Sequence, residues 1–247
     1  MTIRILHVDG RLLFDSEVDR LGEALSIASE EGVDLSGADL AHADLRGANL
    51  EELSLAGADL RGALLDGVNA EEADFDDARM DDVSARGANF ENATFAGASL
   101  ERAVLDGANL ERADLEGAIL EGARAARANL ERACLARVRA HAAVFTRANL
   151  ERCDFSDADL SQADFSGANL EKCDLSNARL TSARAVGANM ERCDLREADM
   201  TDIDVSEANL ERCDIDGAIF DGAKTHGANI EGLRGDFRSR EGGGPYR

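Results

Sequence analysis

The sequence predicts an all-β fold, a four-sided solenoid of about ten coils that follows a small N-terminal cap. Between residues 33 and 232 the 247-residue chain divides into 40 consecutive blocks of five without an insertion, and large apolar residues fall at multiples of five. Phrases such as "ANLE" return every 20 residues. A period of 20 means that four five-residue sides close one coil, so that the fifth side lies on the first.

Each block is expected to be a short extended segment followed by a turn. A period of five fits neither an amphipathic helix nor a flat strand. Alternate residues of an extended segment share a face, so Ala38 and Leu40 are expected to point inward and Asp39 outward. Ten coils stacked at about 4.8 Å would make a rod about 48 Å long.

The glycines support this arrangement. All 16 glycines between residues 33 and 232 lie two residues after the large apolar position. This is the third position of a four-residue turn, where a type II turn requires positive φ and therefore favours glycine. A turn is thus predicted from each large apolar residue to the next small one.

The two ends differ from the repeat. Residues 1–32 are predicted to form a hairpin and helix cap, because a solenoid must cover the core and the backbone edge of its first coil. Residues 33–232 are the predicted repeat domain, and residues 233–247 are a short, polar, glycine-rich tail that we expect to be flexible.

Local signals place the elements of the cap. Asp9 and Gly10 lie between two apolar runs, which is typical of a β-hairpin turn. The apolar residues that follow recur at helical spacing, with Ser16 as the expected N-cap and Gly32 as the expected stop.

Charge and composition restrict the kinds of partner. There are 50 acidic and 27 basic residues, a net charge of -23, which argues against direct contact with nucleic acid or an anionic membrane. No signal peptide is evident and no apolar run reaches the roughly 18 residues of a membrane span. We therefore expect a cytoplasmic protein that binds another protein.

No catalytic, cofactor or metal site is expected, and the chain is predicted not to be an enzyme. The four histidines are scattered, and the two that share one side of the coil, His42 and His141, would lie about 24 Å apart. That separation excludes a shared metal ion or proton relay. Carboxylates on a convex rod also lack an enclosing pocket to shift their pKa.

The five cysteines are predicted to be reduced thiols, because their number is odd and the chain is too large to need disulfides. Four of them replace alanine at the small inward position, spaced by 20, and so would form a straight column in the core. Zinc requires ligands around one point, so core filling is the better interpretation. The fifth, Cys134, takes an outward position and is a candidate exposed thiol. The column consists of Cys153, Cys173, Cys193 and Cys213.

The A(D/N)LXX blocks, repeated 40 times over about 200 of the 247 residues, resemble those of the pentapeptide repeat family. The resemblance implies a right-handed quadrilateral β-helix. Some family members, the quinolone-resistance proteins, are similar enough to DNA to occupy the DNA-binding saddle of gyrase. The resemblance therefore implies a candidate DNA mimic that binds a type II topoisomerase such as gyrase and protects against topoisomerase poisons.

Acidic columns on the outside of the rod are the candidate binding site for such a partner. The net outward charge of each side, in chain order from the side that carries the candidate aspartates, is about -11, -5, +1 and -6. Over the expected length this is one charge per roughly 2.3 Å, against one per about 1.7 Å in duplex DNA. The candidate residues are Asp74, Asp114, Asp154, Asp174, Asp194, Asp214, Glu111, Glu131, Glu151, Glu171 and Glu191.

A second candidate contact face lies on the side whose charge is +1. It combines outward aliphatic residues with arginines, a composition typical of protein interfaces. Its residues are Leu64, Val104, Val144, Arg124 and Arg147.

Two further possibilities stay open. The chain could be a structural or targeting scaffold for other proteins with no link to topoisomerases, its acidity serving solubility alone. The thinly covered C-terminal end of the rod also suggests a homodimer that forms through that end.

Overall fold

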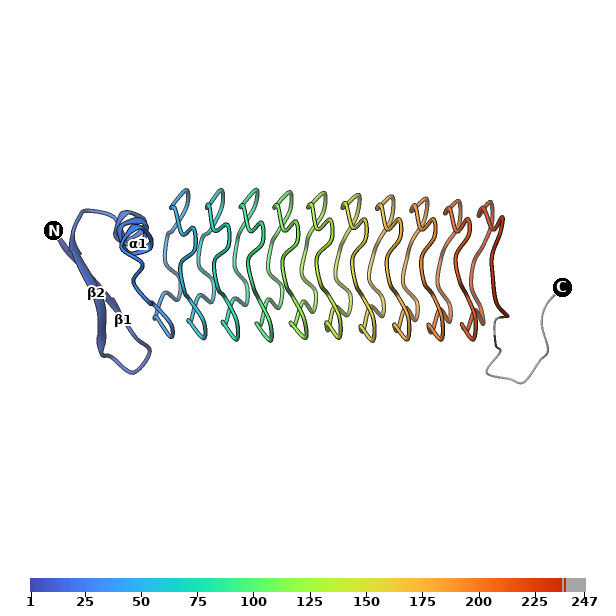
Figure 1. The fold of residues 1–247 in the computed structure, drawn as a ribbon, viewed down its shortest axis with the longest axis horizontal. Helices are drawn as coiled ribbons and strands as arrows, with labels where there is room; N and C mark the ends of the chain where they lie inside the picture. The colour runs from blue at the N-terminus through green and yellow to red at the C-terminus, as the bar shows by residue number, and fades with distance from the viewer. Residues whose placement is uncertain (237, 239–247) are drawn as a thin grey trace.

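The computed structural model describes residues 1–236 and 238. The N-terminal part holds two strands, β1 (Thr2–Leu6) and β2 (Leu12–Glu17), and one helix, α1 (Leu21–Glu30). The rest of the described chain winds into a straight stack of coils that begins directly beside this cap (Figure 1). Among the described residues, no helix has both the length and the apolar character that a bilayer span requires.

Each coil contains 20 residues and has four sides. Residues 39, 44, 49 and 54 lie on four consecutive sides, and they form parallel bridges with residues 59, 64, 69 and 74. Each bridge consists of two backbone bonds to the preceding coil: the Asp59 N–H donates to the Ala38 carbonyl at 2.9 Å, and the Asp59 carbonyl accepts from the Leu40 N–H at 2.8 Å. The predicted four-sided coil is therefore confirmed.

Two of every five residues form the core. Ala108 and Leu110 are typical, with 1% and 0% of their surfaces exposed. Aromatic rings replace leucine in two places, and Phe75 stacks on Phe95 one coil later with ring centroids 5.1 Å apart. On the opposite side of the same coil as Phe75 stands the small Ala85, which leaves room for the ring.

The turns have the predicted geometry. The Leu35 carbonyl accepts a hydrogen bond from the Ala38 N–H at 3.0 Å, and this pattern recurs along the rod. The residue at the third turn position has positive φ in all 40 blocks, yet only 16 of these residues are glycine. The other 24 carry side chains, for example Arg102 at φ 55°. Glycine is thus preferred there but not required, because the left-handed region is allowed to L-residues at a cost of about 1–2 kcal/mol.

The hairpin covers one edge of the first coil. β1 and β2 pair antiparallel around the predicted turn, where Gly10 has φ 90°. From the last residue of β1 the chain runs along the first coil. The Leu6 carbonyl accepts from the Asp39 N–H at 2.8 Å, and the Val8 N–H donates to the Gly37 carbonyl at 2.9 Å. Edge groups that would otherwise lack partners are satisfied in this way.

The helix covers the end of the core and a second edge. α1 buries Ala24, Leu25 and Ala28 against the first coil. The Ser26 hydroxyl accepts a hydrogen bond from the Asn49 N–H at 3.0 Å, and the Ser29 hydroxyl donates to the Glu51 carbonyl at 2.7 Å. The cap therefore contributes both apolar cover and hydrogen bonds.

The helix begins later than the sequence predicts. Ser16 lies inside β2, where it pairs with Ile3, and so cannot cap the helix. The residue at the N-cap is Arg20, which makes no side-chain capping bond. Pairing with β1 extends β2 past Ser16, so the capping signal at Ser16 is not used. The predicted stop at Gly32 is confirmed by its φ of 63°.

Candidate partner-binding surfaces

The six predicted aspartates share one column on one side of the coil, which we call the Asp column. Asp154, Asp174, Asp194 and Asp214 are bridged in succession, one per coil. Thr94 and Cys134 interrupt the earlier part of the column. The full set is Asp74, Asp114, Asp154, Asp174, Asp194 and Asp214.

Each carboxylate of the Asp column also has a structural role. All six side chains are half-buried, and Oδ1 of each accepts the backbone N–H two residues later. The Asp154 bond to the Ser156 N–H, for example, measures 2.8 Å. This bond explains why Asp or Asn recurs here, since both side chains bond their own backbone two residues on.

Asp194 differs from the other members of the Asp column. Its carboxylate also receives the Arg196 guanidinium, whose Nε lies 2.8 Å from Oδ1. The hydrogen bond from Arg196 lowers the pKa of Asp194 below its usual range, and burial opposes that shift. Its charge is therefore already compensated, which makes it the weaker candidate for a basic partner.

The glutamates of the neighbouring column are paired with cations. Lys172 Nζ lies 2.6 Å from Glu171 and 3.9 Å from Glu151, and Arg192 reaches back to Glu171 at 3.9 Å. Lys172 lowers the pKa of Glu171. All five predicted glutamates take part in such ion pairs. Their charges are therefore less available to a partner than those of the Asp column. They are Glu111, Glu131, Glu151, Glu171 and Glu191.

The acidic part of that side lies instead near the N-terminal cap. Glu51, Glu52, Glu71 and Glu72 have no ion pair with any described residue. The sequence held the signal, because Glu52 and Glu72 occupy the position that Arg112 and its successors take in later coils. The predicted site residues begin at Glu111 and leave these four glutamates out.

The second candidate contact face is assembled largely as predicted. Val104, Arg124 and Val144 are bridged on successive coils, and Leu64 lies two coils before Val104 in the same column. Arg147 lies in the turn after Val144. The expectation that the aliphatic residues are exposed is wrong: all three are half-buried, since each is flanked by the coils above and below. The exposed large hydrophobic residues of the described chain lie at its two ends.

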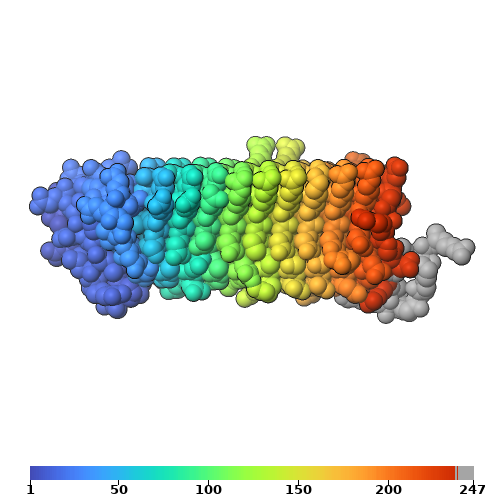
Figure 2. All heavy atoms as spheres, viewed as in Figure 1, coloured from blue at the N-terminus to red at the C-terminus, as the bar shows by residue number. Residues whose placement is uncertain are grey.

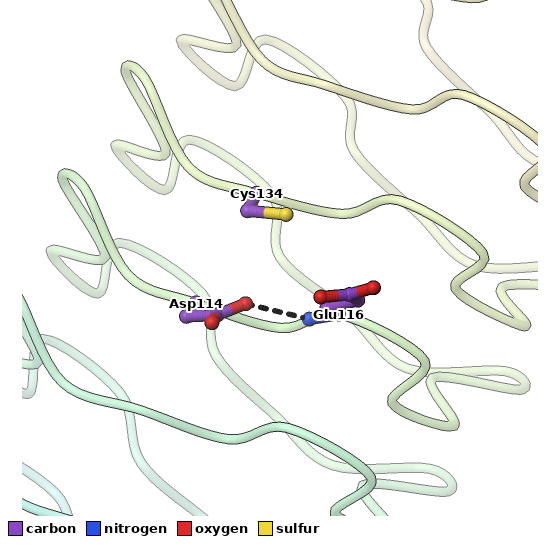
Figure 3. Close-up of side chains that lie close together, drawn as sticks. All are labelled: Asp114, Glu116 and Cys134. Carbon is purple, nitrogen blue, oxygen red and sulfur yellow. Dashed lines mark hydrogen bonds between the residues drawn. The ribbon is translucent and has the colours of Figure 1, made fainter.

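One cluster of metal-ligating types occurs on the Asp column. Ligand atoms of Asp114, Glu116 and Cys134 lie within 4.8 Å of one another (Figure 3). Glu116 is already ion-paired with Arg137, and Asp114 Oδ1 accepts the Glu116 N–H at 2.9 Å. Burial, then the charges of Asp114 and Asp154, raise the pKa of Cys134. The cluster therefore combines a thiol of raised pKa with a carboxylate that is already ion-paired.

The cysteine column lies in the core as predicted. Cys153, Cys173, Cys193 and Cys213 are buried, and each Sγ donates to a carbonyl of the preceding coil at 2.9–3.0 Å. Burial raises the pKa of Cys173 and Cys193 well above the ordinary value. Cys134 is half-buried, not fully exposed as expected.

The C-terminal end of the rod presents apolar core residues. A depression there has an almost wholly apolar lining, and Ile230 is 59% exposed. Most of the predicted tail, namely residues 237 and 239–247, lies outside the described residues. The lining consists of Val205, Leu210, Ile215, Phe220, Thr225, Ile230 and Leu233.

Solved structures with similar folds are pentapeptide repeat proteins. HetL from the cyanobacterium Nostoc sp. strain PCC 7120, involved in heterocyst differentiation regulation, is 28% identical with a TM-score of 0.57, over 82% of this chain and 91% of its own. Full-length QnrB1, a plasmid-mediated fluoroquinolone resistance protein, is 21% identical with a TM-score of 0.36, over 73% and 85%. The QnrB1 match is too distant to support an inference about function. No curated protein sequence matches the chain.

Family profiles cover most of the described repeat. The profile "Pentapeptide repeat region" matches residues 143–220. The profile "Pentapeptide repeats (8 copies)" matches four overlapping segments, residues 31–67, 43–82, 54–92 and 86–122. Together with the 20-residue coil, these matches establish the expected right-handed quadrilateral β-helix with its hairpin and helix cap. The chain belongs to the pentapeptide repeat family.

Proposed function

We propose that the chain is a non-enzymatic, protein-binding solenoid that presents its Asp column to a basic surface of a partner. In the most specific form of this proposal it mimics DNA toward a type II topoisomerase such as gyrase, and so protects against topoisomerase poisons. The observation that carries it is the straight, coil-by-coil stacking of Asp154, Asp174, Asp194 and Asp214 on the most acidic side of the rod.

The physical argument rests on charge and rigidity. The repeat carries about one net charge per 2.3 Å, which approaches the density of duplex DNA. Because each carboxylate is held by a backbone N–H, little side-chain entropy is lost on binding. Strong negative potential also accelerates association with a basic partner. Neither nucleic acid nor membrane is a proposed partner, and we propose a cytoplasmic location.

A gyrase supercoiling assay tests the specific form. The wild-type protein should inhibit supercoiling at micromolar concentration, and the triple variant Asp114→Asn, Asp154→Asn, Asp174→Asn should lose most of that effect. The fold should persist in this variant, since Asn109 makes the same bond to a backbone N–H two residues on, at 3.3 Å.

A matched control separates local from total charge. The triple variant Glu131→Gln, Glu151→Gln, Glu171→Gln removes the same charge from the ion-paired column and should act like wild type. Absence of inhibition by the wild-type protein would contradict topoisomerase binding. Equal activity of all three proteins would contradict the role of the Asp column.

A regulatory scaffold without a topoisomerase partner is the second candidate. The observation that favours it is the better structural match to HetL, which is involved in the regulation of differentiation. A photo-crosslinking residue in place of Ser156, directly after the Asp column, distinguishes the two. A crosslinked gyrase subunit supports DNA mimicry, whereas a different protein supports the scaffold.

We also propose a homodimer that forms through the apolar C-terminal end. The apolar lining and the exposed Ile230 side chain support this proposal, because a second copy would remove the same surface from water twice.

A further inference from the structure

Two arginines interrupt a column of glycines on the side opposite the Asp column. The third turn position on this side is glycine in six of the first eight coils. Arg127 and Arg147, on adjacent coils, take that position at φ 60° and 59°. This left-handed backbone is disfavoured for a residue with a side chain and is freely adopted by glycine, so the arginines do not improve the turn. The glycines are Gly47, Gly67, Gly87, Gly107, Gly167 and Gly187.

The two arginines have no ion pair with any described residue, although the protein carries a net charge of -23. Arg124 beside them touches one carboxylate, that of Asp106, at 3.4 Å. The side chain of Arg147 extends over the next coil, where its Cγ would lie 3.5 Å from a Cβ added to Gly167. Two exposed guanidinium groups without an ion pair to any described residue therefore lie side by side on a molecule whose net charge is negative.

These residues surround a shallow depression of about 370 Å³. Its lining consists of Asp106, Arg124, Ala126, Arg127, Thr146 and Arg147. The half-buried side chains of Val104 and Val144 belong to the bridged column beside it. The site thus combines three cations with apolar neighbours on one side of the rod. In the space-filling view, successive coils form parallel ribs along the rod (Figure 2).

A backbone donor in the depression lacks the carboxylate that its counterpart has. One coil earlier, Oδ1 of Asp106 accepts the Ala126 N–H at 3.0 Å. One coil later, position 126 is alanine and cannot supply that carboxylate to Thr146. Val144, two residues before Thr146, also lacks the acceptor oxygen that an aspartate provides at the matching position of the Asp column. The Thr146 N–H consequently has no acceptor among the described residues.

We infer that this depression binds a carboxylate side chain, aspartate or glutamate, from an acidic segment of a partner protein. The incoming carboxylate takes the place that an aspartate at position 126 would fill, accepts the Thr146 N–H and pairs with Arg127 and Arg147. Arginine forks suit a planar carboxylate, and the flanking valines suit apolar residues of the same segment. The inference is independent of the proposed function, since it concerns the opposite side of the rod and the opposite charge.

Amide NMR of the full chain tests the inference with a defined probe, a short blocked peptide of alternating glutamate and valine. The Thr146 amide should shift on titration, and the matched glutamine and valine peptide should leave it in place. The double variant Arg127→Gly, Arg147→Gly should bind at least about tenfold more weakly, because it loses both charged hydrogen-bond donors. Glycine occupies this position in neighbouring coils, so the fold should persist.

A second variant fills the site from within. Ala126→Asp keeps all three arginines and supplies the missing acceptor, and it should also weaken the peptide by at least about tenfold. Unchanged affinity in both variants, or equal binding of the glutamine peptide, would overturn the inference. A Thr146 shift at a lower concentration of inorganic phosphate than of peptide would overturn it in favour of a free oxyanion.

Discussion

Nδ2 of Asn129 lies 3.0 Å from Oδ1 of Asn109, its counterpart one coil earlier. The same bond joins ten asparagines in nine steps from Asn49 to Asn229. Each interior side chain thus donates to one neighbour and accepts from the other. This amide ladder runs parallel to the backbone bridges and connects every coil to the next.

Replacing an interior member of the ladder should destabilise the protein. In Asn129→Ala the Asn109 side-chain oxygen keeps only the Glu111 N–H as a donor, and the Asn149 amide loses its acceptor in the ladder. We therefore expect a loss of about 1–3 kcal/mol in the free energy of unfolding. Urea denaturation measures it. The control Asn229→Ala removes one bond from an exposed end and should cost less. Equal losses in the two variants would contradict a role for continuity in the ladder.

The turns offer a test of backbone strain. Ala142 has φ 55° and an exposed side chain, so Ala142→Gly should raise the stability by up to about 1 kcal/mol. The reverse change Gly107→Ala should lower it by a similar amount, about 1 kcal/mol, by strain alone. A Cβ at Gly107 would meet nothing within 4 Å, so no clash contributes. Thermal unfolding that moved in the same direction for both changes would exclude the strain explanation.

The buried thiols should make the protein less stable in alkali. The pKa of Cys173 and Cys193 is raised well above 9.0 by burial, and that of Cys213 is raised by its bond with Cys193 and by burial. Above the pKa of the unfolded chain the unfolded thiols release protons and the folded ones do not. Stability is therefore full below that pKa and falls as pH rises, by about 1.4 kcal/mol per pH unit for each thiol.

The triple variant Cys173→Ala, Cys193→Ala, Cys213→Ala should flatten this dependence. Alanine is the usual residue of that inward position, so the fold should tolerate it. Urea midpoints between about pH 8 and pH 10 in reducing buffer provide the comparison, since the ordinary thiol pKa lies in that window. The same slope in both proteins would assign the alkaline loss to other groups.

The C-terminal end should control the oligomeric state. Sedimentation at micromolar concentration is expected to show a dimer for the wild-type protein and a monomer for Ile230→Lys, because a buried charge at the centre of an apolar contact has no partner. The control is Glu52→Lys, at an exposed position near the opposite end of the rod, which should leave the dimer intact. A monomeric wild-type protein would rule out the proposed contact.

The sequence by itself determined the fold of the repeat. Every five-residue block has the same inward pair and the same turn, and an uninterrupted period of 20 leaves a single way to stack Asn109 on Asn129. The cysteine column followed from the same arithmetic. These predictions succeed because each coil contacts only its neighbours, so that local pattern and tertiary contact coincide.

Only the tertiary structure decided which outward residues are free. It showed Asp194 compensated by Arg196, the predicted glutamates paired along the rod, and Arg127 and Arg147 without an ion pair to any residue that the structure describes. It also placed Ser16 in a strand. Periodicity assigns a residue to a column and a face, but pairing depends on side-chain reach across coils 20 residues apart, which a one-dimensional pattern does not contain.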